Sequence, residues 1–343
     1  MKLEKMIRPD LLDLRPYSSA RDEYSGKEGV FLDANENPFD NGMNRYPDPL
    51  QLNLKTKIAE IKSVSEDRVF LGNGSDECID LLIRLLCVPG LDKVSAISPS
   101  YGMYSVSAKI NHIELVNVLL NEDFSLNLDR LIMESKGSKL LFLCSPNNPT
   151  GNAFSKKEIE FILLNFNGLV VVDEAYVDFS AEKSVLCELD NYPNLVVLQT
   201  FSKAYGMAGL RLGMLFASEE IIEWMNKIKP PYNINQSTQS IALERLSDLS
   251  SVRNQIVFLI NERNRVGKKL SENKNVIQVY SSDSNFILIK VKDSEIMYNY
   301  LIINKIIVRN RSNQPLCENC LRLTIGTKEE NDLLIEKMNE FKD

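Results

Sequence analysis

The sequence predicts an α/β protein with a large, mostly parallel sheet covered by helices, followed by a smaller α+β domain. Three observations support this. Through the first two thirds of the 343 residues, short apolar runs alternate with segments of helical period, which is the order of βα units. Several runs are apolar on successive residues, as in strands covered on both faces. After about residue 248, one long helical pattern is followed by alternating strands and a closing helix.

The large domain is expected over residues 31–247, after an N-terminal arm (1–30) that also contributes to the small domain. Helices are expected over Cys78–Cys87 and Lys156–Leu164, and Ser155 with Glu158 has the spacing of a capping box. The expected strands are Val69–Leu71, Val94–Ile97, Leu140–Cys144, Leu169–Val172, Leu195–Gln199 and Met214–Phe216.

The small domain is expected over residues 248–343. A polar-faced helical pattern covers Asp248–Asn273, and a closing helix is expected near Glu329–Phe341. Between them, Asn285–Val291 and Leu321–Ile325 show the alternation of strands.

Composition excludes several classes of protein. With 40 Lys+Arg against 47 Asp+Glu, the net charge of −7 argues against a nucleic-acid-binding or anionic-membrane-binding surface. The chain begins without the apolar core of a signal peptide, and it has no apolar run long enough to span a bilayer. The six cysteines are scattered, so a reduced, cytoplasmic protein is expected.

The single histidine, His112, excludes catalytic sites that need several imidazoles, and it is expected to be structural. If the protein is an enzyme, its base must be Lys, Tyr or a carboxylate. Cys317 and Cys320 have the spacing of half a zinc site or a redox pair. Without a second pair or a nearby histidine, no metal site is expected.

Four motifs lie at predicted strand ends or helix starts, where open α/β sheets bind ligands. Gly72–Glu77 could hold an anion at a helix N-terminus, although an ordinary strand-to-helix turn explains it equally well. Ser145–Gly151 places the amide of Asn148 in a proline-fixed loop. Val170–Tyr176 ends a buried run with Asp173, whose charge needs a partner.

The fourth motif, Thr200–Gly213, places Lys203 just after a strand and Arg211 just before the next one. The apolar run before Asp173 and Glu174 also resembles the Walker B segment of nucleotide hydrolases. However, no G-x-x-x-x-G-K-[ST] motif precedes it. Together the four motifs match what pyridoxal phosphate needs: an anion cradle, a carboxylate for the ring nitrogen, donors for the ring oxygen and a lysine for the aldehyde.

These residues resemble those of the fold-type I, class I/II aminotransferases over almost the whole chain. Within that family the chain is similar to the members that act on histidinol phosphate. The segments that carry the resemblance are Pro16-Tyr17, Asp33–Pro38, Arg45–Pro47, Gly74–Glu77, Pro99–Tyr104, Ser145–Gly151, Asp173–Tyr176, Ser202-Lys203 and Leu321–Gly326.

The resemblance implies a cofactor, pyridoxal 5'-phosphate, and a role for each matching residue. Lys203 attaches the cofactor and moves the Cα proton, Asp173 pairs with the ring nitrogen, and Asn148 and Tyr176 donate to the ring oxygen. Tyr101 stacks on the ring. The phosphate group is implied to be held by the segment that contains Ser75, Asp76 and Glu77, with backbone amides of the first two, and by Thr200, Ser202 and Arg211.

For the substrate, the resemblance implies that Arg322 binds an anionic group, with Arg309 and Tyr17 assisting and Asn35 bordering it. Arg311 follows closely and could substitute for Arg309. A guanidinium fork can hold either a phosphate or a carboxylate. The implied reaction is transamination of L-histidinol phosphate with 2-oxoglutarate, in histidine biosynthesis. Tyr46 is implied to reach the cofactor of a neighbouring subunit, in a homodimer with shared active sites.

Three other functions stay open on the same residues. The chain could transaminate aromatic or other neutral amino acids. It could be a pyridoxal-phosphate-dependent decarboxylase of a phosphorylated amino acid. It could also bind the cofactor without catalysis, which the intact Lys203, Asp173 and Asn148 disfavour.

Overall fold

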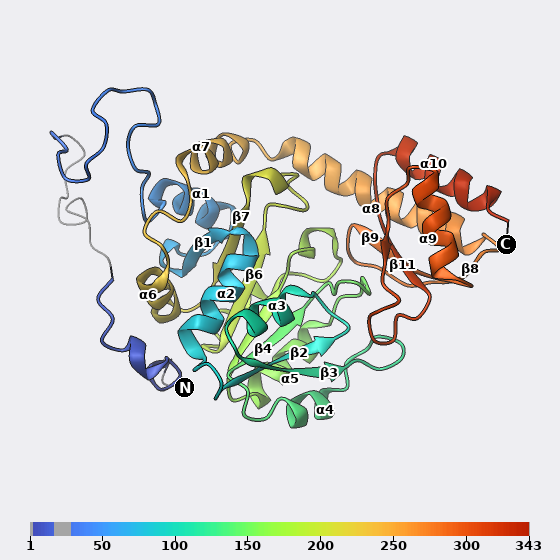
Figure 1. The fold of residues 1–343 in the computed structure, drawn as a ribbon, viewed down its shortest axis with the longest axis horizontal. Helices are drawn as coiled ribbons and strands as arrows, with labels where there is room; N and C mark the ends of the chain where they lie inside the picture. The colour runs from blue at the N-terminus through green and yellow to red at the C-terminus, as the bar shows by residue number, and fades with distance from the viewer. Residues whose placement is uncertain (1–2, 17–28, 343) are drawn as a thin grey trace.

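The computed structural model describes residues 3–16 and 29–342, which form two sheets and their covering helices (Figure 1). The larger sheet has seven strands in the order β1-β7-β6-β5-β4-β2-β3. Its strands are β1 (Val69–Asn73), β2 (Lys93–Ser98), β3 (Glu114–Leu119), β4 (Leu140–Cys144), β5 (Leu169–Asp173), β6 (Leu195–Thr200) and β7 (Leu212–Phe216). Strands β2 to β6 are parallel, and β7 runs antiparallel to β1 and β6. The predicted mostly parallel sheet is therefore confirmed.

In the larger sheet, β3 is the strand that no apolar run predicted. It lies at the sheet edge and most of its residues are exposed or half-buried, so it lacks the continuous apolar run of an interior strand. The interior strands β4, β5 and β6 are buried at every position, which is why their ends were predicted almost to the residue.

Helices cover both faces of this sheet. One apolar cluster includes residues of α1, α4, α5 and α7, and the other includes residues of α2, α3 and α6. The helices are α1 (Leu52–Lys62), α2 (Gly74–Leu86), α3 (Met103–Ile110), α4 (Leu128–Glu134), α5 (Lys156–Asn165), α6 (Glu219–Ile228) and α7 (Gln236–Arg245). The capping box of Ser155 and Glu158 is present at the start of α5. Near the N-terminus, Leu3 and Ile7 are buried on the α2 side of the sheet.

The second sheet has the order β10-β11-β9-β8 and is antiparallel. Its elements are α8 (Ser250–Ser271), β8 (Val276–Val279), β9 (Phe286–Val291), α9 (Ser294–Ile303), β10 (Arg309–Asn310), β11 (Cys320–Thr324) and α10 (Lys328–Glu340). Ile289 and Leu323 lie in a core with residues of α8, α9 and α10. The alternate residues Leu288 and Cys320 pack instead into the core of the large sheet. One face of β9 and β11 is thus turned toward the larger sheet.

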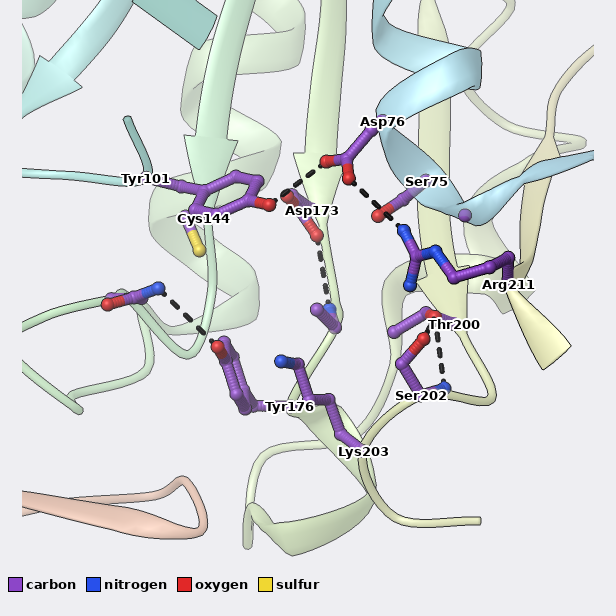
Figure 2. Close-up of a pocket in the computed structure, with 13 residues that line it drawn as sticks. Ser75, Asp76, Tyr101, Cys144, Asp173, Tyr176, Thr200, Ser202, Lys203 and Arg211 are labelled. Carbon is purple, nitrogen blue, oxygen red and sulfur yellow. Dashed lines mark hydrogen bonds and ion pairs between the residues drawn. The ribbon is translucent and has the colours of Figure 1, made fainter. Parts of the chain in front are cut away.

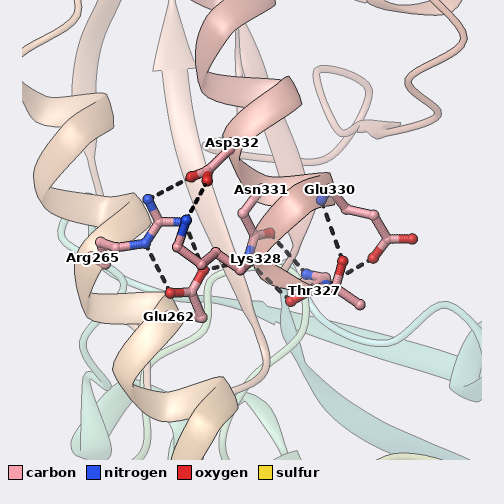
Figure 3. A network of polar contacts seen from close by, with 8 residues as sticks. Glu262, Arg265, Thr327, Lys328, Glu330, Asn331 and Asp332 are labelled. Atoms are coloured by element: carbon pink, nitrogen blue, oxygen red, sulfur yellow. Dashed lines mark hydrogen bonds and ion pairs between the residues drawn. The ribbon is translucent and has the colours of Figure 1, made fainter.

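A polar network joins α8 to α10 just after β11 (Figure 3). Arg265 binds Glu262 through two hydrogen bonds of 2.8 and 2.7 Å, and it pairs with Asp332 at 2.7 Å. Asn331 donates to Glu262 at 2.9 Å and to the Gly326 carbonyl at 3.0 Å. Because Gly326 follows β11 by two residues, these bonds fix the end of the strand that carries Arg322.

Within the described ranges, no helix combines the length and the apolar character needed to cross a membrane. Nor do His, Cys, Asp or Glu side chains gather in the described part of the chain in groups of three that could hold a metal ion. Cys317 and Cys320 are buried free thiols.

Candidate active site

The four motifs meet in one pocket at the carboxyl ends of the central strands (Figure 2). This edge is where parallel strands present the loops that bind ligands. The pocket is lined by Gly74, Ser75, Asp76, Tyr101, Cys144, Asn148, Asp173, Ala175, Tyr176, Thr200, Ser202, Lys203 and Arg211. The motifs predicted from the sequence therefore supply the side chains of this pocket. The fold brings them together from segments that lie along the chain between β1 and β7.

One end of the pocket can hold an anion. Helix α2 begins at Gly74 with no side-chain cap. The Gly74 amide donates to the Arg211 carbonyl at 2.8 Å, which leaves the amides of Ser75 and Asp76 in the first turn for a ligand. Arg211 lies beside them, with Nη2 3.5 Å from Asp76 Oδ2. Ser202 and Thr200 complete this end, joined by a 3.0 Å hydrogen bond between their hydroxyls. Amides, hydroxyls and a guanidinium are the donors that bind phosphate groups.

Two glycines allow this end to close tightly. Gly74 has φ +75°, and a Cβ there would lie 2.7 Å from Arg211 Nη2. In β7, a Cβ on Gly213 would lie 2.1 Å from the backbone nitrogen of Ser75. Helix α2 therefore starts in direct backbone contact with β7, which a side chain would prevent.

We expect Gly213→Ala to lower the free energy of unfolding by about 2 kcal/mol, because the methyl group must push α2 from β7. Gly209→Ala is the matched control, since no atom lies within 4 Å of its added Cβ. Chemical denaturation of both variants measures the difference. Equal stabilities would contradict the close contact.

Asp173 lies at the end of β5 and is buried, with 2% of its surface exposed. Burial raises the pKa of its carboxyl to about 6, although a hydrogen bond from Tyr104 opposes the change. Tyr104 Oη donates to Asp173 Oδ2 at 2.7 Å, and the Ala175 amide donates to Oδ1 at 3.2 Å. Near neutral pH the carboxylate is held charged in a buried site, where a cationic ligand would stabilise it.

Lys203 projects into the same pocket, with Nζ 5.6 Å from the centre of the Tyr176 ring. The pKa of its ammonium group is lowered, first by burial and then by the positive charge of Arg322. A lysine with a lowered pKa is a better nucleophile and base near neutrality, because more of it is the free amine.

The wall formed by Asn148 and Tyr176 connects the loop after β4 to Arg322 of the smaller sheet. Asn148 Nδ2 donates to Tyr176 Oη at 3.4 Å, while its Oδ1 accepts from Arg322 Nη1 at 2.6 Å. Arg322 comes from β11, and its guanidinium lies 5.2 Å from the centre of the Phe286 ring. The same amide thus fixes a phenol and a guanidinium at the edge of the pocket.

Tyr101 forms another wall, and its hydroxyl donates to Asp76 Oδ1 at 2.9 Å. Asp76 therefore bridges the aromatic wall and Arg211 through its two oxygens. The resemblance implied a backbone role for Asp76, and this bridge adds a side-chain role.

The remaining expected residues lie outside this pocket. Glu77 turns away and accepts from the Asn73 amide at 2.6 Å and from Asn233 at 3.0 Å. Asn35 is exposed, and Tyr46 stacks on Tyr232 with ring centres 4.5 Å apart. Arg309 lies opposite Arg322 in the β10–β11 pair. Tyr17 lies outside the described residues.

Two contributors to the site received no role from the sequence, although both end segments that the sequence analysis quoted. Tyr104 ends the segment Pro99–Tyr104, and it holds the carboxylate of Asp173. Gly213 ends the motif Thr200–Gly213, and its requirement comes from a contact with Ser75, 138 residues away in the sequence. His112 lies in the turn before β3 with φ +56°, outside the residues that line the pocket.

Comparisons with known proteins agree with this architecture. The sequence model described as "Aminotransferase class I and II" matches residues 30–338. A curated relative from Christiangramia forsetii, named histidinol-phosphate aminotransferase, is 54% identical over 99% of this chain and 98% of its own length.

Two solved structures share the fold. The histidinol-phosphate aminotransferase from Clostridium acetobutylicum has a TM-score of 0.81 and 24% identity, over 87% of this chain and 90% of that one. That from Sinorhizobium meliloti, in complex with pyridoxal-5'-phosphate, has a TM-score of 0.79 and 22% identity, over 86% and 82% of the two chains. The predicted fold class is therefore confirmed.

Proposed function

The chain belongs to the class I and II aminotransferase family, and from that premise we propose that it transfers the amino group of L-histidinol phosphate to 2-oxoglutarate. The products are imidazole acetol phosphate and L-glutamate, and the pathway is histidine biosynthesis. The curated relative at 54% identity carries the name of this activity. The observation that carries the proposal is the common pocket of Lys203 and Asp173, with an anion cradle at one end and Arg322 near the other.

The residues present fit pyridoxal 5'-phosphate as the cofactor. The amides of Ser75 and Asp76 at the start of α2, together with Thr200, Ser202 and Arg211, match the donors that a phosphate group needs. The buried carboxylate of Asp173 matches a protonated ring nitrogen, because each neutralises the other's charge. When bound, the cofactor withdraws electrons from the substrate Cα.

The walls of the pocket orient that ring. Asn148 and Tyr176 lie together and can both donate to the ring oxygen, while Tyr101 offers a face for stacking. Tyr104 and the Ala175 amide keep Asp173 in place and charged. Glu77 supports the turn that leads into α2, so we assign it an indirect part in cofactor binding.

Lys203 would hold the cofactor through its amine, and as a free amine it would take the proton from the substrate Cα. Its lowered pKa favours both roles, since each requires an unprotonated amine. Arg322 and Arg309 lie opposite each other on β11 and β10, and they bind the anionic group of either substrate. Asn35 and Tyr17 are further substrate contacts in this proposal, and the support for them is the family resemblance.

The active enzyme is a homodimer in this proposal. Residues 29–51 carry no helix or strand, and they expose Val30 and Leu32 (87% each) and Phe39 (80%). This segment runs outside the body of the chain beside α1 (Figure 1). Apolar side chains gathered on a surface segment mark a protein interface. Tyr46, on the same segment, then reaches the partner's cofactor, and sedimentation velocity tests the dimer.

We place the enzyme in the cytoplasm. All six cysteines are free thiols in the structure, which is the state expected in a reducing compartment.

Steady-state kinetics with alternative amino donors test the proposed substrate. We expect kcat/KM for L-histidinol phosphate to exceed that for L-phenylalanine by at least about 100-fold, because phenylalanine offers the half-buried guanidinium of Arg322 only a singly charged carboxylate in place of a phosphate dianion. A preference for phenylalanine would instead identify an aromatic aminotransferase. Release of carbon dioxide without any need for a keto acid would identify a decarboxylase.

A further inference from the structure

A third arginine lies beside the two that the resemblance assigned to the substrate. Arg309 is opposite Arg322 in the β10–β11 register, and the Arg311 amide donates to the Cys320 carbonyl at 2.9 Å, which continues the same ladder. Side chains two residues apart in a strand share a face, so Arg309 and Arg311 lie on one side. That side also carries Arg322, which contacts Asn148 at the edge of the pocket.

The positive charges of this arginine cluster (Arg309, Arg311 and Arg322) are not balanced by carboxylates. Among residues 3–16 and 29–342, no Asp or Glu forms an ion pair with any of the three. The Nε atoms of Arg311 and Arg322 are buried and have no acceptor there. Buried donors without acceptors are costly, and a ligand that accepts from them would remove that cost.

Arg311 lies close enough to Arg309 and Arg322 for their positive charges to affect its pKa. Burial first, and then Arg322 and Arg309, lower the pKa of Arg311 to about 10, while the Tyr176 phenol opposes that change. The three positive charges therefore repel one another, and the Tyr176 phenol that lines the pocket is close enough to Arg311 to interact with its charge. An arrangement that is unfavourable alone is typical of a binding site for an anion.

We propose that Arg311 is a third guanidinium of the substrate-anion site and sets its preference for the doubly charged phosphate monoester over a singly charged carboxylate. The two positive charges of Arg309 and Arg322 already exceed the single negative charge of one carboxylate. A third positive charge therefore adds most to the binding of a dianion. This inference rests on the proposed function, because it assigns the phosphate of histidinol phosphate to this cluster.

The test compares holoenzyme variants Arg311→Gln and Arg311→Lys with the control Arg245→Gln, which removes an exposed arginine from the last turn of α7. We expect Arg311→Gln to raise KM for L-histidinol phosphate by about 10- to 100-fold with little change in kcat. KM for L-glutamate should rise by less than about threefold. Arg311→Lys should lie between, since it keeps the charge but loses the planar fork. The control should match the wild type.

Inorganic phosphate, as a competitive inhibitor of the reaction with glutamate, gives a second measurement that does not depend on the identity of the amino donor. Arg311→Gln should weaken this inhibition by about the same factor. An equal change for glutamate and histidinol phosphate, or no change for either, would overturn the role of Arg311. A wild-type enzyme that binds phosphate through Arg311 but does not turn over histidinol phosphate would overturn only the proposed function. If Arg311→Gln does not fold, the change in KM for histidinol phosphate relative to glutamate is measured in Arg311→Lys instead, and the same outcomes support or overturn the role of Arg311.

Discussion

Replacing Lys203 with alanine should lower kcat for histidinol phosphate by roughly 10,000-fold or more. The change removes the amine that attaches the cofactor and the base that takes the Cα proton, and a positioned base alone contributes up to about 10,000-fold. Lys203 lines the pocket without any ion pair to a described carboxylate, so its loss should leave the fold intact. Single-turnover kinetics with added cofactor measure the effect on the chemical step.

Lys57→Ala is the matched control, because Lys57 forms only a surface pair with Glu60 on α1. It should keep activity within about twofold of the wild type. If Lys203→Ala retained more than a few per cent of the wild-type rate, another group would have to be the base. The single histidine lies outside the pocket lining, so it offers no ready substitute.

Replacing Asp173 with asparagine should slow removal of the Cα proton by about 100- to 1,000-fold, because a buried carboxylate that stabilises charge is lost. Cofactor should still bind, since the phosphate cradle at α2 lies at the other end of the pocket and stays unchanged. A single-turnover rate equal to that of the wild type would contradict the role of Asp173.

The same substitution should stabilise the cofactor-free protein. Asp173 has a folded-state pKa of about 6, above its ordinary value of 3.8, so keeping it ionised in the fold costs free energy above pH 6. At pH 7 the asparagine variant should be more stable by up to about 3 kcal/mol. That advantage should shrink as the pH falls from 7 to 5 and the wild-type carboxyl takes up its proton. Denaturation of the two proteins at both pH values measures the change, with exposed Asp129→Asn as control.

A slower rate together with a higher stability in Asp173→Asn would show that Asp173 serves the reaction and not the fold. A residue kept only for the fold would lower stability when replaced, whereas a buried charge kept for chemistry should raise it. Loss of stability in the cofactor-free asparagine variant at pH 7 would therefore contradict the assignment.

The parts of the fold that the sequence predicted well are those where burial leaves a direct pattern. The strands that end at Cys144 and Asp173 are apolar at successive positions, because helices cover both faces. The edge strand Glu114–Leu119 and the two-residue strand Arg309–Asn310 have no such pattern, since their neighbours rather than their composition define them.

The residues of the site fall into the same two groups, those that the sequence predicts and those that depend on tertiary packing. Lys203, Asp173 and Asn148 follow strands that run to one edge of the sheet, so their meeting could be predicted from topology. The contact between Gly213 and Ser75, and the hydrogen bond from Tyr104 to Asp173, depend on packing between distant segments. The same is true of Arg311, whose place beside Arg322 comes from strand pairing.

The proposition that the lysine and the carboxylate act at two ends of one cofactor can be tested in a single spectroscopic titration. Purified protein is loaded with pyridoxal 5'-phosphate, and L-histidinol phosphate is added without a keto acid. We expect the visible absorption of the bound cofactor to disappear stoichiometrically and to return when 2-oxoglutarate is added. A protein that does not take up the cofactor, or whose absorption histidinol phosphate leaves unchanged, would contradict the account.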